Sequence, residues 1–124
     1  SVELSINGDY NLVGKINAPL FEWVIENLIK NALDAIDHSN GKITISIKEN
    51  KNNIEIEIFD NGKGIDIKRR KDVFRPGYST KRRGWGLGLS LSKRIIEEYH
   101  NGKIFVKSSI IGEGTIFKIV LAKS

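Results

Sequence analysis

The stretch that decides the fold is ITISIKENKNNIEIEIFDNGKG, residues 43–64. Isoleucine occupies every second position at 43, 45 and 47 and again at 54, 56 and 58. A period of two places alternate side chains on one face of a strand, and the polar link 50–53 is typical of a turn. The stretch therefore predicts a β-hairpin with one buried face, followed by a glycine-containing loop that begins after Asp60.

The segments around this hairpin alternate between helical and extended patterns. Residues 20–37 carry apolar side chains at helical spacing, and Pro19 suits the first turn of a helix. Residues 87–100 return to that spacing and end at Asn101-Gly102, a pair that favours helix termination. Further strands are expected at residues 3–6, 12–16, 103–108 and 115–122. The sum predicts an α+β fold, a two-layer α/β sandwich whose helices cover one face of a mixed, mostly antiparallel sheet.

Composition limits the function classes. The chain has 124 residues, 40% of them hydrophobic, which fits a single domain over residues 1–124. It has no cysteine, so disulfides and thiolate metal sites are excluded, and a reducing cytosol is expected. We expect no membrane contact by this domain, because no apolar run reaches about 18 residues and Ser1 opens no leader peptide. Since the chain does not begin with Met, we expect it to be part of a longer protein.

Positive charge is concentrated in one segment of a chain whose formal net charge is +5. The basic residues there are Lys68, Arg69, Arg70, Lys71, Arg75, Lys81, Arg82 and Arg83. Such concentration favours a compact anion such as triphosphate over a nucleic-acid groove, although the acidic face of a partner fits equally well. The segment 66–84 has little periodicity and contains Pro76, Gly77 and Gly84, so it is predicted to be a long, mobile loop.

The stretch GWGLGL, residues 84–89, places alternating glycines at the start of the second helix. Bare backbone at a helix start can close around phosphate, since the amides point outward and the helix dipole favours anions. Ser79, Thr80 and Lys81 lie just before it, and lysine binds phosphate as a flexible point charge. The alternative interpretation is a solvated basic loop.

Asn27, Asn31 and Asp34 form one polar stripe on the first helix, at the border of its apolar face. An amide oxygen is a hard, neutral ligand, so Asn31 is a candidate for one position of an octahedral Mg²⁺. The simpler alternative is a solvated flank of a surface helix.

Asp60 ends the second strand of the hairpin and is followed by Asn61, Gly62, Lys63 and Gly64. An ionised carboxylate accepts hydrogen bonds, so it can read the exocyclic amino group of adenine while the glycines let a flat ring approach. A β-turn alone is the competing explanation of DNG.

Other nucleotide sites and hydrolase sites fit poorly. The sequence has no GxxxxGK[ST] run, and its glycine box follows an arginine-rich loop where a dinucleotide fold has a strand. No Ser-His-acid or HExxH pattern is present, and His38 and His100 are expected to be helix-end or surface histidines.

Five segments occur in the order of the N, G1, F, G2 and G3 boxes of sensor histidine kinases: ENLIKNALDAI, DNGKGID, VFRPGYSTK, GWGLGLSLSKRII and GEGTIF. The chain resembles this family, within the gyrase, heat-shock chaperone, histidine kinase and mismatch-repair ATPase superfamily, from Pro19 to its end. The resemblance implies a Bergerat-type sandwich with a flexible ATP lid near residues 66–84. It also implies ATP and Mg²⁺ as cofactors, and transfer of the γ-phosphoryl group to a histidine on a separate dimerisation domain. A downstream response regulator and a cytoplasmic location follow from the same resemblance.

The resemblance also assigns roles to residues. Asn31 is the expected magnesium ligand, Asn27 a phosphate-side contact and Asp60 the adenine anchor, and Asn27, Asn31 and Lys81 are the expected catalytic residues. Phe74 is expected on the docking surface of the lid. The remaining predicted nucleotide contacts are Gly62, Gly64, Ile65, Ser79, Thr80, Lys81, Gly84, Gly86, Leu87, Gly88, Leu89 and Thr115.

Asn27 carries a mechanistic prediction. Superfamily members that hydrolyse ATP tend to have a glutamate at this position, four residues before the metal asparagine, where it can deprotonate water. An amide is no general base, so the resemblance predicts slow hydrolysis and a γ-phosphate kept for a histidine acceptor. Glu26 lies about 100° round the helix, toward the solvent face, and is discounted as the base.

Departures from the family pattern leave alternatives open. Asp34, Ala35 and Gly77 replace residues common in sensor kinases, and no phosphoacceptor motif is present, so the acceptor histidine is expected elsewhere. The alternatives are a nucleotide-binding switch module without transferase activity and a serine kinase that acts on an anti-sigma-factor antagonist. The sequence does not give the signal, the cognate response regulator or whether the parent protein is membrane-anchored.

Overall fold

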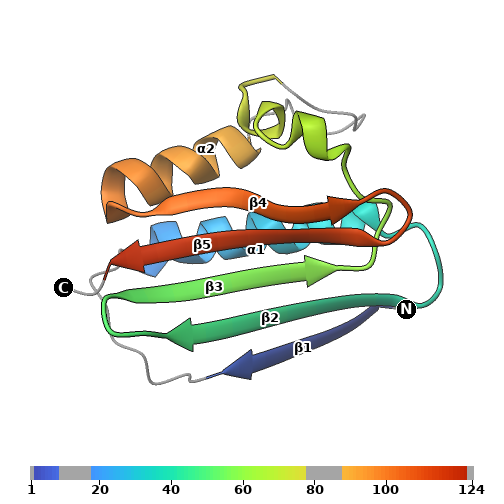
Figure 1. The fold of residues 1–124 in the computed structure, drawn as a ribbon, viewed down its shortest axis with the longest axis horizontal. Coiled ribbons are helices and arrows are strands. Elements are labelled where there is room, and N and C mark those ends of the chain that lie inside the picture. Colours follow the sequence, from blue (N-terminus) through green and yellow to red (C-terminus); the bar gives the residue numbers. More distant parts are fainter. Residues whose placement is uncertain (1, 9–17, 78–87, 123–124) are drawn as a thin grey trace.

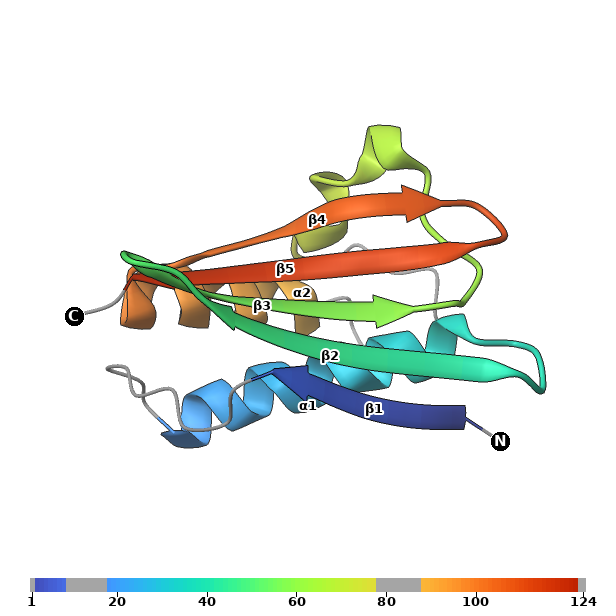
Figure 2. The same ribbon diagram turned by 60° about the horizontal axis from the view of Figure 1, so that its bottom comes forward.

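The computed structural model describes residues 2–8, 18–77 and 88–122. In these segments five strands form one sheet in the order β1-β2-β3-β5-β4. The strands are β1 (Val2–Gly8), β2 (Gly41–Glu49), β3 (Asn53–Asp60), β4 (Lys103–Ile110) and β5 (Gly114–Ala122). The helices are α1 (Ala18–Ala35), α2 (Gly88–Arg94), the π-helical turn η3 (Ile95–Tyr99) and the 3₁₀ turns η1 (Ile67–Arg69) and η2 (Asp72–Phe74). Figures 1 and 2 show α1 and α2 together on one face of the sheet.

The β2–β3 hairpin has the register that its isoleucines predict. Ile45 lies opposite Ile58 and Ile47 opposite Ile56, in an antiparallel pair. The turn is held by Asn50, whose side-chain oxygen accepts hydrogen bonds from the backbone N–H groups of residues 52 and 53 at 3.1 and 2.7 Å. The inward isoleucines form the sheet side of the core.

The strand expected at residues 3–6 is confirmed and extends over Val2–Gly8. It pairs in parallel with β2, which makes the sheet mixed, whereas the remaining pairs are antiparallel. The strand expected at 12–16 lies outside the described residues.

Helix α1 supplies the other side of the core. Val24, Leu28 and Ala32, spaced by four residues, are 0–2% exposed. The helix ends at Ala35, two residues before the predicted end, and the Ala35 carbonyl accepts a hydrogen bond from the backbone N–H of Lys63 at 2.8 Å. The loop after β3 therefore satisfies one of the carbonyls that the helix end leaves unpaired.

The end of the second helix confirms the predicted Asn-Gly terminator. Asn101 has a φ of 49°, and the N–H of Gly102 donates to the carbonyl of Ile96 at 2.9 Å. His100, at this helix end, is 8% exposed and donates from Nδ1 to the Ile95 carbonyl at 2.9 Å. Its ring centroid lies 5.9 Å from that of Phe21 on α1, so its role is structural, as predicted.

The segment predicted as a loop from residue 66 is more ordered than its lack of periodicity indicated. It forms η1 and η2, and Val73 and Phe74 are buried. The Phe74 ring contacts the Phe117 ring edge-on, with 6.1 Å between the two ring centroids. The Lys93 ammonium lies 5.7 Å from the centroid of the Phe74 ring. The lack of periodicity predicted a loop but gave no sign of these two short turns or of the buried residues in the second. Val73 and Phe74 hold this segment against the rest of the protein, but two buried residues are too few to produce a periodic pattern in the sequence.

Candidate nucleotide site

Asp60 lies at the end of β3, at the point where the strand leads into the glycine-containing loop. Its side chain is 3% exposed, and its Oδ1 accepts a hydrogen bond from the Gly62 N–H at 2.9 Å. Burial raises the pKa of Asp60, and the Gly62 hydrogen bond opposes that rise. Across the sheet its register partner on β5 is Thr115, which is also 3% exposed. A desolvated carboxylate beside a buried hydroxyl is the arrangement expected of a binding group.

The glycines after Asp60 are required by the packing of the protein itself. A Cβ on Gly62 would lie 2.5 Å from the Ala35 carbonyl oxygen at the end of α1. Gly64 has a φ of 79°, and a Cβ there would overlap the backbone of Ile110. The loop therefore packs closely between the end of α1 and the end of β4. The contact of these glycines with a nucleotide base stays a prediction.

Sequence reasoning did not predict the contacts of Asn61 and His38. Hydrogen bonds of these two residues hold the loop after Asp60 against the start of β2 and the residues before it. The Asn61 side chain accepts from the Lys42 N–H at 2.7 Å and donates to the Asn40 carbonyl at 2.9 Å. His38 Nδ1 accepts from the Asn40 N–H at 3.2 Å, so Nε2 carries the proton and donates to the Asn61 carbonyl at 2.9 Å. The sequence analysis of this motif assigned no contact to Asn61, and no sequence pattern pointed to these tertiary contacts.

Sequence reasoning also missed Ser109. This residue, near the end of β4, is 9% exposed, and its hydroxyl lies 2.7 Å from the Ile65 backbone N and 2.8 Å from the Thr115 hydroxyl. It therefore joins two predicted nucleotide contacts, Ile65 and Thr115. The only sequence signal was its position close to the GEGTIF motif.

The polar stripe of α1 lies where its spacing predicted, at the border of the apolar face. Asn27 and Asn31 are half-buried and Asp34 is exposed. The Asn27 amide donates to the hydroxyl of the fully buried Ser92 at 3.2 Å, and that hydroxyl donates to the Gly88 carbonyl at 2.8 Å. A Cβ on Gly88 would lie 2.5 Å from Asn27 Oδ1, so the first helix and the last glycine of the GWGLGL stretch meet directly.

The neighbouring surface of α1 carries Glu26, which is exposed as predicted. A shallow hollow beside Asn27 is lined by Trp23, Glu26, Asn27 and Lys30. Leu89, also predicted to contact nucleotide, is partly buried against the hydrophobic core. Ser79, Thr80, Lys81, Gly84, Gly86 and Leu87 lie outside the described residues.

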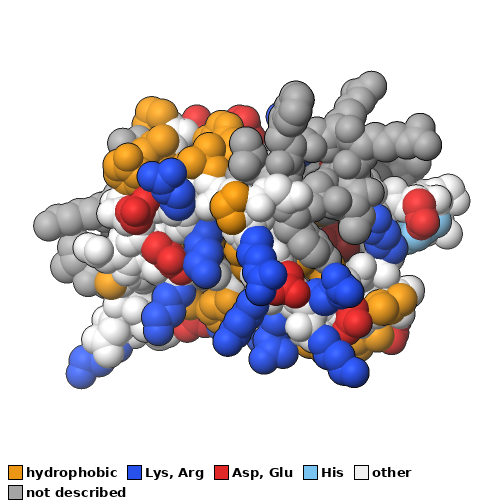
Figure 3. All heavy atoms as spheres, turned by 90° about the horizontal axis from the view of Figure 1, so that it is seen from above, with side chains coloured by type: hydrophobic (Ala, Val, Ile, Leu, Met, Phe, Trp, Pro, Cys, Tyr) orange, Lys and Arg blue, Asp and Glu red, His pale blue; other side chains and the backbone are white. Residues whose placement is uncertain are grey.

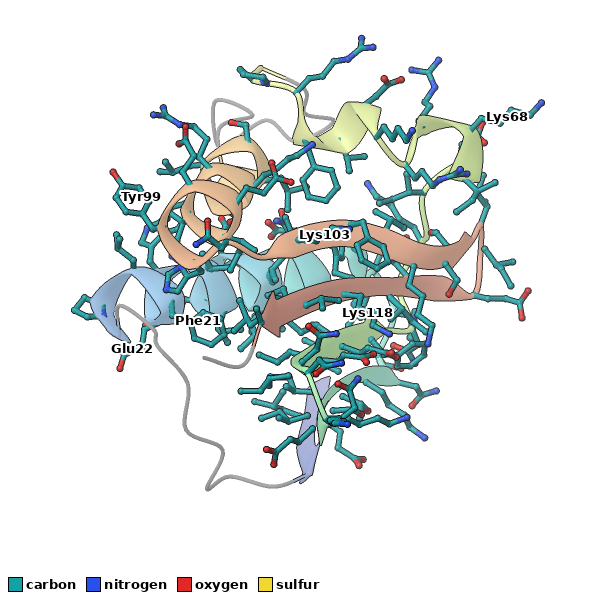
Figure 4. The ribbon with its side chains drawn as sticks, turned by 60° about the vertical axis from the view of Figure 1, so that its left-hand side comes forward. Phe21, Glu22, Lys68, Tyr99, Lys103 and Lys118 are labelled. Carbon is teal, nitrogen blue, oxygen red and sulfur yellow. The ribbon has the colours of Figure 1, made fainter. Side chains whose placement is uncertain are left out.

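Part of the basic segment is visible on the surface. Lys68, Arg69, Arg70 and Lys71 are exposed on η1 and the turn after it, beside β4. Figure 3 shows Lys and Arg side chains distributed over this side of the molecule. Lys118 lies instead on the outer face of the sheet (Figure 4), where it pairs with Glu55 and Glu57.

Within the described segments no group of three or more His, Asp or Glu side chains is arranged to hold a metal ion. None of the helices described there is long and apolar enough to cross a membrane.

Comparison with known proteins agrees with this geometry. Residues 17–124 match the profile of the family described as histidine kinase-, DNA gyrase B-, and HSP90-like ATPase. The chain therefore belongs to this family, and the resemblance and the α+β sandwich predicted from the sequence are confirmed. Membership in an ATPase family of this kind implies that the domain binds ATP.

The similar proteins include sporulation kinases and sensor histidine kinases. The chain is 35% identical to sporulation kinase C of Bacillus subtilis (strain 168) over 116 residues, 94% of the chain and 24% of that protein. It superposes on the nucleotide-free catalytic domain of the histidine kinase ThkA with a TM-score of 0.85 and 27% identity, covering 98% of the chain and 79% of that domain. It also matches ThkA in a complex with the response regulator TrrA, at 25% identity and a TM-score of 0.82, over 99% of the chain and 34% of that kinase. The chain thus spans about a quarter of the curated relative's length.

Proposed function

We propose that this domain binds Mg²⁺-ATP and transfers the γ-phosphoryl group to a histidine on a separate dimerisation domain. The observation that carries the proposal is that one helix, α1, contacts both groups of motif residues. Its end supports the loop after Asp60 through Ala35, and its middle meets Gly88 through Asn27. About 12 Å of helix separates Asn27 from Ala35, which suits a nucleotide lying along α1 with its base at Asp60.

At the base end, Asp60 would accept a hydrogen bond from the exocyclic amino group of adenine. Guanine has an oxygen at that position, so an ionised carboxylate would reject it. The Gly62 N–H helps to keep the buried carboxylate ionised, because a hydrogen bond to the charged form lowers the pKa.

At the phosphate end, Asn31 fits the magnesium role by its donor chemistry. It is half-buried one helical turn after Asn27 and offers a single neutral oxygen, which suits a cation held mainly by phosphates and water. The bound cation would neutralise phosphate charge during transfer. Lys81, in the predicted lid near residues 66–84, would complete this end.

Transfer requires an acceptor from outside this domain. A nitrogen of the acceptor histidine forms the new P–N bond while the bond to the bridging oxygen breaks, and ADP leaves with the electron pair. Within the domain His100 is buried against Phe21, and His38 is hydrogen-bonded to the loop after β3. Neither is placed as an acceptor, which supports a separate phosphoacceptor domain.

The partners of the whole protein follow from its relatives. A response regulator is bound to ThkA in the complex with TrrA. We infer that the parent protein passes its phosphoryl group to a response regulator and that this domain works on the cytoplasmic side.

The test is a calorimetric titration of ADP and ATP, with and without Mg²⁺, into the wild type and into Asp60→Ala and Asn31→Ala. We expect adenine-selective binding that Asp60→Ala abolishes, and a magnesium dependence that Asn31→Ala removes. A folded wild type that binds no adenine nucleotide would refute the proposal.

Intrinsic hydrolysis tests the role of Asn27. We expect slow ATP turnover by the wild type, unchanged in Glu26→Gln. Rapid turnover that Glu26→Gln stops and Asn27→Ala does not would identify Glu26 as a base and contradict the assignment.

A further inference from the structure

Ser109 belongs to none of the five motifs, yet its hydroxyl connects two of them. Its Oγ lies 2.7 Å from the Ile65 backbone N, 2.8 Å from Thr115 Oγ1 and 3.2 Å from the Gly114 carbonyl oxygen. Ile65 directly follows Gly64, and Thr115 is the register partner of Asp60. One buried hydroxyl therefore ties the loop expected under the base to the strand beside the adenine anchor.

A β-bulge selects Ser109 for this position. The register of β4 with β5 shifts between Val106 and Ser108, so that Ser108 lies opposite Ile116 and Ser109 opposite Thr115. Without that shift, the regular count from the Val106–Phe117 pair would bring Ser108 opposite Thr115. Ser108 is exposed, and Ser109 is 9% exposed.

The hydrogen-bonding capacity of the serine limits its proton to two arrangements. A hydroxyl has one donor and two acceptor positions, and the Ile65 N–H occupies one acceptor. Ser109 either donates to the Gly114 carbonyl and accepts from Thr115, or donates to Thr115. In the second arrangement the Thr115 proton is available to another acceptor in the site.

We propose that Ser109 is a positioning residue for adenine recognition, an inference that rests on the proposed function. It holds the Gly64–Ile65 backbone in place and, by donating to Thr115, leaves the threonine proton for the bound nucleotide. Alanine at this position removes both effects and leaves the Ile65 N–H without its acceptor.

The experiment compares ADP and GDP binding to the wild type, Ser109→Ala and the matched control Ser108→Ala, at a temperature at which all three are folded. Ser109→Cys, which keeps a similar shape but replaces oxygen by a larger, weaker hydrogen-bonding sulfur, serves if the alanine variant does not fold. Amide hydrogen exchange at Ile65 is measured in the same proteins by NMR without nucleotide.

We expect Ser109→Ala to weaken ADP binding about tenfold and to lower the preference for ADP over GDP, with faster exchange at Ile65. Ser108→Ala should stay within about twofold of the wild type. A purely structural serine would leave the base preference unchanged. ADP affinity within about twofold of the wild type in Ser109→Ala, or an equal loss in Ser108→Ala, would overturn the positioning role while the proposed function stands. A wild type that does not bind ADP would refute the proposed function itself.

Discussion

The two ends of the proposed site, the base end at Asp60 and the phosphate end at Asn27 and Gly88, are held together in different ways. At the base end, Gly62, Gly64 and Gly114 each face backbone atoms of another segment, and Asp60 is buried among them. At the phosphate end, the three atoms nearest to a Cβ on Gly88 all belong to the side chain of Asn27, which is half-buried. Backbone atoms of strands and helix ends move little, whereas the far end of an amide side chain rotates readily.

From this difference we expect the base end of the proposed site to be formed before nucleotide arrives and the phosphate end to adjust on binding. A preformed base pocket lowers the entropy lost on binding and gives selectivity. An adjustable phosphate end suits a group that must accept ATP and release ADP.

The largest effect is expected from Gly114→Ala. Gly114 has a φ of 140°, and a Cβ there would overlap the backbone carbonyl of Asp60, so strands β3 and β5 would have to separate. We expect a loss of about 3 kcal/mol or more in the free energy of unfolding, measured in urea.

The matched control is Gly112→Ala in the same hairpin. Gly112 also has a positive φ, 86°, but no atom lies within 4 Å of its added Cβ, so only backbone strain of about 1 kcal/mol is expected. Equal losses in the two variants would show that backbone strain dominates and that the contact with Asp60 is unimportant.

A second, intermediate effect concerns the charge of Asp60. Burial raises the pKa of Asp60 in the folded state. Protonation of Asp60 therefore stabilises the folded wild type at low pH, and this stabilisation is lost as the pH rises from about 4 through the raised pKa. Asp60→Asn has no such titration. Its free energy of unfolding should therefore increase relative to the wild type as pH rises through this window, while ADP binding falls about tenfold or more.

Denaturant unfolding at several pH values, with ADP titrations at neutral pH, checks both parts of this prediction. A stability difference between Asp60→Asn and the wild type that does not depend on pH would show that the Gly62 hydrogen bond compensates fully for burial. The same result would weaken the contrast drawn between the two ends.

Much of the base end could be predicted from sequence because its elements are local patterns. Alternating isoleucines gave the β2–β3 hairpin and placed Asp60 at the strand end, and the four-residue spacing of Val24, Leu28 and Ala32 gave the buried face of α1. These patterns depend only on the period of each element.

What the sequence could not provide depends on contacts between distant segments. The Lys63 N–H binds the Ala35 carbonyl at the end of α1, and Phe74 packs against Phe117 in a segment with no period of its own. The choice of Ser109 over Ser108 depends on a one-residue bulge, which no local pattern shows.

The smallest effect on stability is expected from Gly88→Ala, at the phosphate end. The added methyl group meets Asn27 Oδ1, and because that atom is the end of a side chain it can turn away. We expect a loss within about 1 kcal/mol in the free energy of unfolding, since alanine is also the better helix former.

Turning Asn27 breaks its hydrogen bond to Ser92, so ATP binding in the presence of Mg²⁺ should weaken several-fold while ADP binding without Mg²⁺ changes little. Calorimetric titration separates the two, and the control is Leu91→Ala, at a position of α2 whose side chain is exposed. If Gly88→Ala costs as much stability as Gly114→Ala, then the phosphate end is as rigid as the base end and the site is preformed along its whole length.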